Sequence, residues 1–328
     1  MTDTRLIGPE FRFRRLRRTP ALREMVRETR LHPSDFIRPI FVEENIQEPV
    51  AIASMPGVVR YPENQLAEQV QASWKKGIRA VLLFGVSSHK DAVGADTWND
   101  EGLMARMIRT AKAAQPDMCV ICDNCFCEYT DHGHCGVVCN DDVDNDQTLL
   151  NLQKQVVVAA RAGADMIAPS GMQDGMIGLI RAALDDAGYE QIPVMSYSTK
   201  FASAFYGPFR DAVDSTFKGS RNTYQMDPAN AREALAESLQ DEAEGADILM
   251  VKPGIAYLDV LAHIRAHSSR PLAVYQVSGE YAMIKAGAQA GVIDERAVAL
   301  ESLLAFKRAG ADMIISYYAD QAAVWLTE

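Results

Sequence analysis

The segments ARAGADMIAPS (160–170), EGADILMVKPG (244–254) and KRAGADMIISYYA (307–319) share one pattern. In each of them a helical stretch ends at a glycine, and Ala-Asp and a short apolar run follow. Glycine at a helix C-terminus adopts the left-handed conformation that ends the helix. A continuous apolar run is typical of a parallel strand that is buried on both faces. The pattern therefore predicts repeated β/α units, and KKGIRAVLLFGV (75–86) is a looser copy.

Further strands fit between these copies, at 36–42, 118–123, 192–198 and 271–278. Amphipathic helices are expected between strands, for example over 63–76, 146–162 and 294–309. The expected strands begin near residues 36, 80, 118, 165, 192, 247, 271 and 312. Eight β/α units predict an α/β fold, a (β/α)8 TIM barrel over residues 35–328. An open doubly wound sheet is the main alternative, but no glycine-rich phosphate loop follows the first strand.

The first thirty residues are basic, with nine arginines and four acids, in a chain of net charge −11. We expect residues 1–34 to form an N-terminal arm that makes oligomer contacts on an acidic neighbouring subunit. A mitochondrial transit peptide is the alternative, which the acids in the segment weaken. The acidic balance argues against nucleic-acid binding. We expect no membrane span and a cytoplasmic location, because long apolar runs and a signal-peptide core are absent from the sequence.

All six cysteines fall between Cys119 and Cys139. Such clustering indicates a metal site rather than a disulfide framework, whose bridges would be spread along a short chain. Three of these cysteines have the spacing C-x-C-x7-C: Cys125, Cys127 and Cys135. Three thiolates with one open position suit a catalytic Zn²⁺.

Other ligand sets stay open at this point. His134 could replace one thiolate, and Cys122 or Cys139 could close the site as a fourth ligand. We expect Cys119 and Cys122 to be buried strand thiols that pack as small hydrophobic groups.

Two lysines close consecutive apolar strands, Lys200 after MSYST and Lys252 after LMV. TIM-barrel active sites lie where strands end and βα loops begin. A lysine in a low-dielectric site beside another cation has a lowered pKa, and its free amine can attack a ketone. Asp123 ends the third strand and is a candidate for proton transfer. These residues predict Schiff-base chemistry.

The connection over 199–227 is rich in aromatic residues and is expected to act as a lid. Three cations lie in it: Arg210, Lys218 and Arg221. Such cations favour carboxylate recognition. Hydroxyls at the last strand ends, Ser278 and either Tyr317 or Tyr318, could bind a second carboxylate or satisfy backbone groups. A carboxylate-bearing ketone is the expected substrate.

Two other functional classes stay open. A class I aldolase would need only one reactive lysine and no thiolate-bound metal. A non-catalytic zinc-containing assembly protein would keep the cysteines but tolerate loss of both lysines.

Four segments resemble the delta-aminolevulinic acid dehydratase (porphobilinogen synthase) family: CFCEYTDHGHCGV, MSYSTKFASAFYGPFRDA, DILMVKPG and YQVSGEYAMIKA. The likeness covers nearly the whole chain, in the same order. It implies a lyase that condenses two molecules of 5-aminolevulinate to porphobilinogen, with loss of two waters, in tetrapyrrole (haem) biosynthesis. It also implies a homo-octamer whose N-terminal arms wrap neighbouring subunits.

The resemblance further implies residue roles. Cys125, Cys127 and Cys135 match a catalytic zinc triad, and Lys200 and Lys252 match two Schiff-base lysines, of which Lys252 holds the substrate that becomes the propionate-bearing half. Carboxylate contacts are implied for five residues: Arg210, Arg221, Asn222, Ser278 and Tyr317. Asn222 is a departure, because the family usually has a second basic residue there. Glu237 matches the place where some bacterial members bind an allosteric Mg²⁺.

Overall fold

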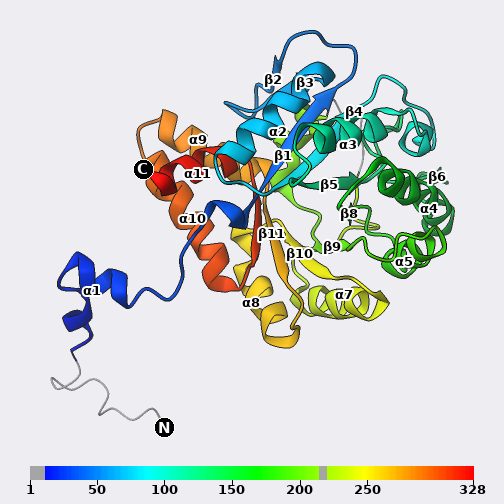
Figure 1. The fold of residues 1–328 in the computed structure, drawn as a ribbon. Helices are drawn as coiled ribbons and strands as arrows, with labels where there is room; N and C mark the ends of the chain where they lie inside the picture. The colour runs from blue at the N-terminus through cyan, green and yellow to red at the C-terminus, as the bar shows by residue number, and fades with distance from the viewer. Residues whose placement is uncertain (1–11, 214–219) are drawn as a thin grey trace.

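Eight parallel strands form a nearly closed barrel in the computed structural model, which describes residues 12–213 and 220–328 (Figure 1). The barrel strands are β1 (Phe36–Glu43), β4 (Ala80–Val86), β5 (Cys119–Asn124), β8 (Met166–Pro169), β9 (Met195–Lys200), β10 (Ile248–Lys252), β11 (Leu272–Gln276) and β12 (Met313–Ser316). They pair in the order β8-β5-β4-β1-β12-β11-β10-β9, and an isolated parallel bridge from Ile167 to Val194 connects the two ends. All eight predicted strands are present, and the predicted TIM barrel is confirmed.

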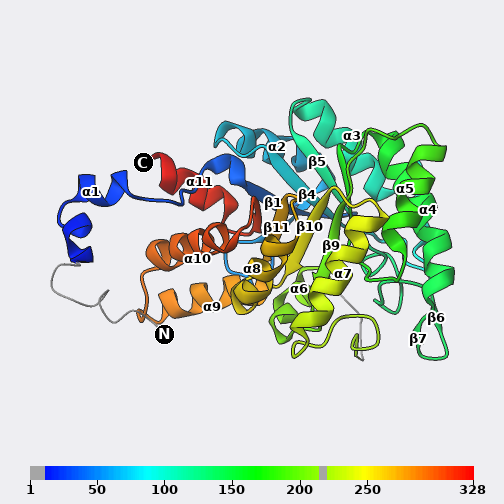
Figure 2. The ribbon, with the colours of Figure 1, turned by 90° about the horizontal axis from the view of Figure 1, so that it is seen from below.

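Helices surround the strands (Figure 2). They are α2 (Leu66–Lys75), α3 (Leu103–Ala114), α4 (Asn145–Ala162), α5 (Met176–Asp186), α6 (Gly207–Ala212), α7 (Ala231–Glu244), α8 (Leu258–His267), α9 (Ser278–Gln289), α10 (Glu295–Ala309) and α11 (Ala319–Thr327). The helices predicted over 146–162 and 294–309 are confirmed as α4 and α10. The helix predicted from residue 63 begins with a 3₁₀ turn, η4 (Glu63–Gln65), before α2.

Two short antiparallel hairpins were not expected from the sequence. One pairs β2 (Val50–Ala51) with β3 (Val59–Pro62), which also extends the edge of β1. The other pairs β6 (Val138–Cys139) with β7 (Asp142–Val143) in the loop after β5. Strands this short carry too few residues to show an alternating apolar pattern.

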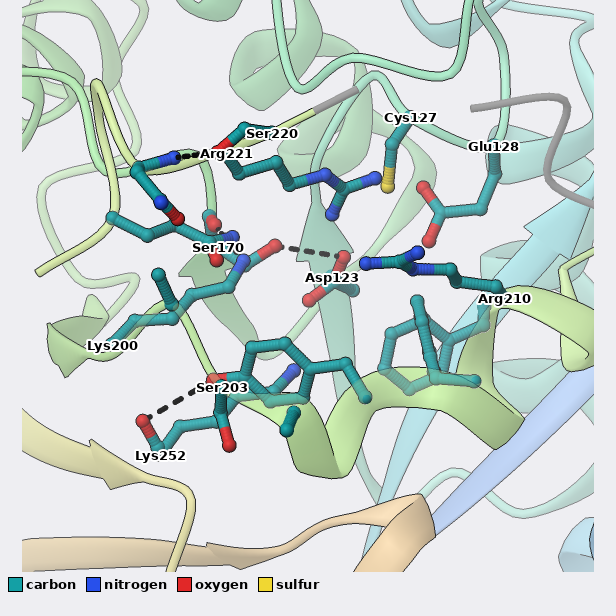
Figure 3. A pocket seen from close by; sticks show the side chains of 17 residues that line it. Asp123, Cys127, Glu128, Ser170, Lys200, Ser203, Arg210, Ser220, Arg221 and Lys252 are labelled. Carbon is teal, nitrogen blue, oxygen red and sulfur yellow. Dashed lines mark hydrogen bonds between the residues drawn. The ribbon is translucent and has the colours of Figure 1, made fainter. Parts of the chain in front are cut away.

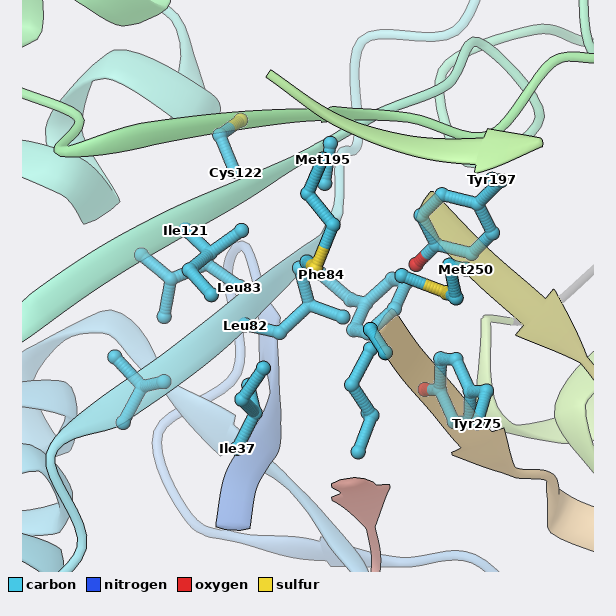
Figure 4. Close-up of a cluster of buried hydrophobic side chains, with 14 of the residues drawn as sticks. Ile37, Leu82, Leu83, Phe84, Ile121, Cys122, Met195, Tyr197, Met250 and Tyr275 are labelled. Carbon is cyan, nitrogen blue, oxygen red and sulfur yellow. The ribbon is translucent and has the colours of Figure 1, made fainter. Parts of the chain in front are cut away.

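Apolar side chains from neighbouring strands fill the barrel interior (Figure 4). The cluster includes Ile37, Leu82, Ile121, Met195 and Met250. Their burial removes apolar surface from water, which is the dominant stabilising contribution to such a fold. This core fills the barrel up to the carboxyl ends of the strands, where the cavity of the candidate active site begins.

The outer cysteines are placed differently from one another. Cys122 is buried in the core, as predicted, whereas Cys119 is only partly buried and packs against the core. Cys139 lies exposed in the β6–β7 hairpin.

The aspartates of the Gly-Ala-Asp repeats connect adjacent strands. The Oδ2 atoms of Asp165, Asp247 and Asp312 each accept a hydrogen bond at 2.8 Å from a backbone N–H in, or directly before, the barrel strand that precedes them in the chain. The three donors are Val120, Val194 and Leu272. Each aspartate also donates its own N–H to the carbonyl of the same residue, at 2.7–3.0 Å. These reciprocal pairs fix the register of three strand pairs, at the end of the barrel opposite the two lysines.

The described N-terminal segment, which begins at residue 12, lies apart from the barrel in both views (Figures 1 and 2). Its described part contains η2 (Phe13–Arg17) and α1 (Pro20–Met25), and neither helix buries a residue. Phe13 is 68% exposed and Met25 is 79% exposed. The prediction that residues 1–34 form an arm with oligomer contacts stays a prediction, and residues 1–11 lie outside the described part.

No helix within 12–213 and 220–328 is both long enough and apolar enough to cross a lipid bilayer.

Candidate active site

A cavity of about 260 Å³ opens where the barrel strands end (Figure 3). Polar residues in or directly after the ends of β5, β8, β9 and β10 meet residues of the 199–227 connection there. The polar lining includes Asp123, Cys127, Glu128, Ser170, Lys200, Ser203, Arg210, Ser220, Arg221, Asn222, Gln225 and Lys252. The structure therefore brings together both predicted lysines, the predicted aspartate and two of the three predicted cations of the connection, Arg210 and Arg221.

The two lysines are neighbours because β9 pairs with β10 in a register that places Lys200 opposite Lys252. They are 5% and 6% exposed. Burial, followed by the charge of Lys200, lowers the pKa of Lys252 to about 7, while Asp123 opposes this change. The Lys252 Nζ lies 4.3 Å from the ring centre of Tyr275 and 5.0 Å from that of Tyr197. A lysine in this setting can present a neutral, nucleophilic amine close to neutral pH.

Asp123 faces both lysines. Its carboxylate accepts a hydrogen bond from the Ser170 hydroxyl at 3.2 Å, and the Lys200 ammonium donates to the Ser170 carbonyl. Burial raises the pKa of Asp123, whereas the charges of Lys252 and Lys200 lower it. Opposed influences of this kind are typical of a group that exchanges protons during a reaction.

The cysteine trio assembles next to this cavity. The ligand atoms of Cys125, Cys127 and Cys135 all lie within 4.8 Å of one another, and the Sγ atoms of Cys125 and Cys127 are 3.3 Å apart. All three cysteines are buried. Hydrogen bonds from the other two thiols, with help from the nearby Arg221 charge, hold the pKa of Cys135 well below its ordinary value. Three converging thiols with a favourable charge beside them are the donor set that Zn²⁺ prefers, so these residues fit the predicted metal.

The alternative ligand sets are not assembled. In the part of the chain that the structure describes, two groups of three metal-ligating residues converge: the cysteine trio, and Asp123 with Cys125 and Glu128. His134 belongs to neither group, and its Nδ1 lies 3.2 Å from the Tyr224 hydroxyl. Cys122 and Cys139 are likewise outside both groups.

Several lining residues were missed from sequence. Glu128 directly follows Cys127 and is 2% exposed; burial, and then the Asp123 charge, raise its pKa to about 7. Ser170 could have been found, because it follows the apolar run of the 160–170 segment just as Lys252 follows the run of the 244–254 segment. Gln225 lies in the irregular connection, where no periodic pattern indicates side-chain direction.

The predicted carboxylate contacts fall into two groups. Arg210, Arg221 and Asn222 line the cavity, and Arg221 Nη2 also donates to the carbonyl of Gly133 at 2.9 Å. This bond connects the 199–227 connection to the cysteine loop. Lys218 lies in 214–219, outside the described residues.

Ser278 and Tyr317 do not line this cavity. Ser278 is fully buried; its hydroxyl accepts the Phe209 N–H at 3.0 Å and donates to the Phe205 carbonyl at 3.4 Å. Tyr317 lines a separate cavity, and its hydroxyl lies 3.2 Å from that of Tyr275, whose ring lies beneath Lys252. Because the Ser278 hydroxyl bonds to the backbone of Phe205 and Phe209, the 203–213 segment covers Ser278.

Glu237 lies on α7, on the outside of the barrel, and is partly buried. Burial, and then the charges of Asp174, Glu233 and Glu244, raise its pKa to about 6. It is in neither of the converging ligand groups named above.

Comparisons with known proteins show which family the chain belongs to. The delta-aminolevulinic acid dehydratase family matches residues 10–325. A delta-aminolevulinic acid dehydratase of Escherichia coli (strain K12) is 58% identical and covers 93% of this chain and 94% of its own length. One from Bacillus subtilis (strain 168) is 50% identical, covering 97% of this chain and 98% of its own length.

A solved structure of the same family has the same fold. The delta-aminolevulinic acid dehydratase of Toxoplasma gondii ME49, in complex with the reaction product porphobilinogen, superposes with a TM-score of 0.93 at 45% identity. The match covers 96% of this chain and 91% of that chain. The chain therefore belongs to the delta-aminolevulinic acid dehydratase family of enzymes.

Proposed function

We propose that this enzyme condenses two molecules of 5-aminolevulinate to porphobilinogen with loss of two waters, through Schiff bases on Lys252 and Lys200. The observation that carries the proposal is the pair of buried lysines in register on β9 and β10, one of them with a pKa of about 7. The product named for the Toxoplasma gondii relative is consistent with this reaction.

The first covalent step uses the neutral amine of Lys252. Its nitrogen attacks the ketone carbon of one substrate, and after proton transfers the carbonyl oxygen leaves as water, which leaves an iminium. Lys200 does the same with the second substrate. An iminium acidifies the adjacent carbon, so that loss of a proton gives an enamine nucleophile. Asp123 lies where it can accept and return such protons.

Cys125, Cys127 and Cys135 would hold the catalytic zinc. When bound there, zinc supplies Lewis-acid chemistry toward a substrate oxygen. The buried setting of the three thiols excludes bulk water from that side of the cavity.

Two different carboxylate sites would hold two identical substrates in different poses. Arg210, Arg221 and Asn222 line the cavity and suit one carboxylate. Ser278 and Tyr317 would receive the other once the segment that carries Phe209 moves off Ser278. Holding both reactants in fixed poses makes the condensation effectively intramolecular.

Borohydride reduction tests the proposal directly. With 5-aminolevulinate present, reduction should attach substrate mass to the peptide that contains Lys252. Lys252→Ala should lose this adduct and porphobilinogen formation, whereas replacement of the exposed Lys75 should change neither. Normal turnover by Lys252→Ala would contradict the mechanism.

The metal and assembly proposals need separate measurements. Chelation should remove activity while sparing far-UV circular dichroism, because barrel closure does not depend on the cysteine loop. We also propose a homo-octamer joined by the arms, and Mg²⁺ binding at Glu237. Light scattering tests the octamer, and Mg²⁺ titration of Glu237→Gln beside the unaltered protein tests the ion.

A further inference from the structure

A buried glutamate, Glu280, joins the loops that follow β10 and β11. It lies in the first turn of α9, two residues after Ser278, and is 0% exposed. Its Oε2 accepts the backbone N–H of Val277 at 2.7 Å and that of Gly254 at 3.4 Å. Its Oε1 accepts the N–H of Ile255 at 2.5 Å. One carboxylate therefore holds donors from two separate loops.

Both loops carry residues of the proposed chemistry. Gly254 comes two residues after Lys252, and Val277 comes directly before Ser278. The loop after β10, which contains Gly254, packs closely against Phe306: a Cβ at position 254 would lie 2.5 Å from the Phe306 ring. The loop therefore has little room to adopt another conformation. The contacts of Glu280 therefore fix Lys252 and Ser278 relative to each other.

The arrangement needs a carboxylate of this length. An ionised carboxylate has only acceptor sites and can serve several N–H groups at once. A glutamine would keep one acceptor oxygen, and its NH₂ would face a backbone donor that it cannot satisfy. An aspartate would keep the charge but would be too short to reach both loops from α9.

We propose that Glu280 is a positioning residue that sets the span between Lys252 and Ser278 and thereby selects the length of the keto acid bound. This inference rests on the proposed function, in which Lys252 binds the ketone and Ser278 the carboxylate of the same substrate. Two methylene groups separate these functions in 5-aminolevulinate. A fixed span accepts that length and rejects a longer chain, and one methylene is worth about 10- to 200-fold in such selection.

Competitive borohydride trapping measures this selection without requiring turnover. The probes are 4-oxopentanoate, which is 5-aminolevulinate without its amino group, and 5-oxohexanoate, which is one methylene longer. Mass spectrometry of the Lys252 peptide gives the ratio of the two adducts in the zinc-loaded, full-length protein. The unaltered protein should prefer 4-oxopentanoate, and in Glu280→Gln this preference should fall by about tenfold or more.

Glu68→Gln is the matched control, since Glu68 is also the third residue of its helix, α2, but is exposed. It should keep the full preference. A folded Glu280→Gln that is trapped with the preference intact would overturn the inference. If Glu280→Gln does not fold, Glu280→Asp takes its place, and an unchanged preference in that variant is equally decisive. Absence of any adduct at Lys252 in the unaltered protein would instead reject the proposed function.

Discussion

Burial of an ionisable amine should make the stability of this enzyme depend on pH through Lys252. The pKa of Lys252 falls from 10.5 to about 7 on folding. Between these two pH values the unfolded chain therefore binds more protons at this site than the folded chain does. The contribution of Lys252 to the free energy of unfolding therefore rises with pH. At about 1.4 kcal/mol for each pKa unit, burial of this amine costs about 4 kcal/mol at pH 7 and about 2 kcal/mol at pH 9.

Lys252→Met removes this cost while it keeps a side chain of similar length. The variant should be more stable than the unaltered enzyme near pH 7, and its advantage should shrink by about 1 kcal/mol for each pH unit toward pH 10. Urea unfolding of both proteins at equal metal content and concentration, at pH 7, 8 and 9, measures the difference. Lys75→Met, at an exposed site, is the control. An advantage that does not change between pH 7 and 9 would show that Lys252 is not held in a neutral form.

Three further predictions concern the barrel and the metal loop. Asp247→Ala leaves a strand N–H without its acceptor, so we expect a loss of about 1–3 kcal/mol of unfolding free energy by urea titration. Cys125→Ala should lose bound zinc, measured by elemental analysis, whereas Cys122→Ala should keep it because Cys122 lies in the core. Gly254→Ala should destabilise the protein by about 1–3 kcal/mol, since the new Cβ overlaps the Phe306 ring.

Each of these predictions has an outcome that contradicts it. An Asp247→Ala protein as stable as one with alanine at the exposed Asp186 would show that the reciprocal pair contributes little. Equal zinc content in Cys125→Ala and Cys122→Ala would show that the cysteine trio does not hold the metal. An unchanged unfolding midpoint in Gly254→Ala would mean that the loop after Lys252 has room to relax.

The barrel could be predicted because each repeat carries a helix end and a strand start in one short segment. Gly245, for example, has φ of +108° and ends α7, and the apolar run to Lys252 follows directly. The same strand-end logic placed both lysines and Asp123 in one cavity. The cysteine spacing likewise predicted three thiols that do converge.

Other features depend on contacts that no local pattern encodes. The strand expected to run to Ser278 ends at Gln276, because Glu280 accepts the Val277 N–H and the chain turns into α9. Glu128 carries no signal in the sequence, and only the fold places it beside the buried thiols of Cys127 and Cys135. Such positions follow from the packing of distant segments, which composition and periodicity do not describe.

The reciprocal aspartate pairs fall into two groups along the chain, one pair nearer the N-terminus and two nearer the C-terminus. Val120 with Asp165 lies wholly before residue 187, and the other two pairs lie wholly after it. Between β8 and β9, the backbone pairing in the described part of the chain is an isolated bridge from Ile167 to Val194. The barrel strands can thus be divided into two halves, which meet here and at the parallel β1–β12 pair. The cysteine loop belongs to the first half and both lysines to the second. Fragments separated in the α5–β9 connection would each keep their own pairs, and catalysis would return only when the halves reassociate.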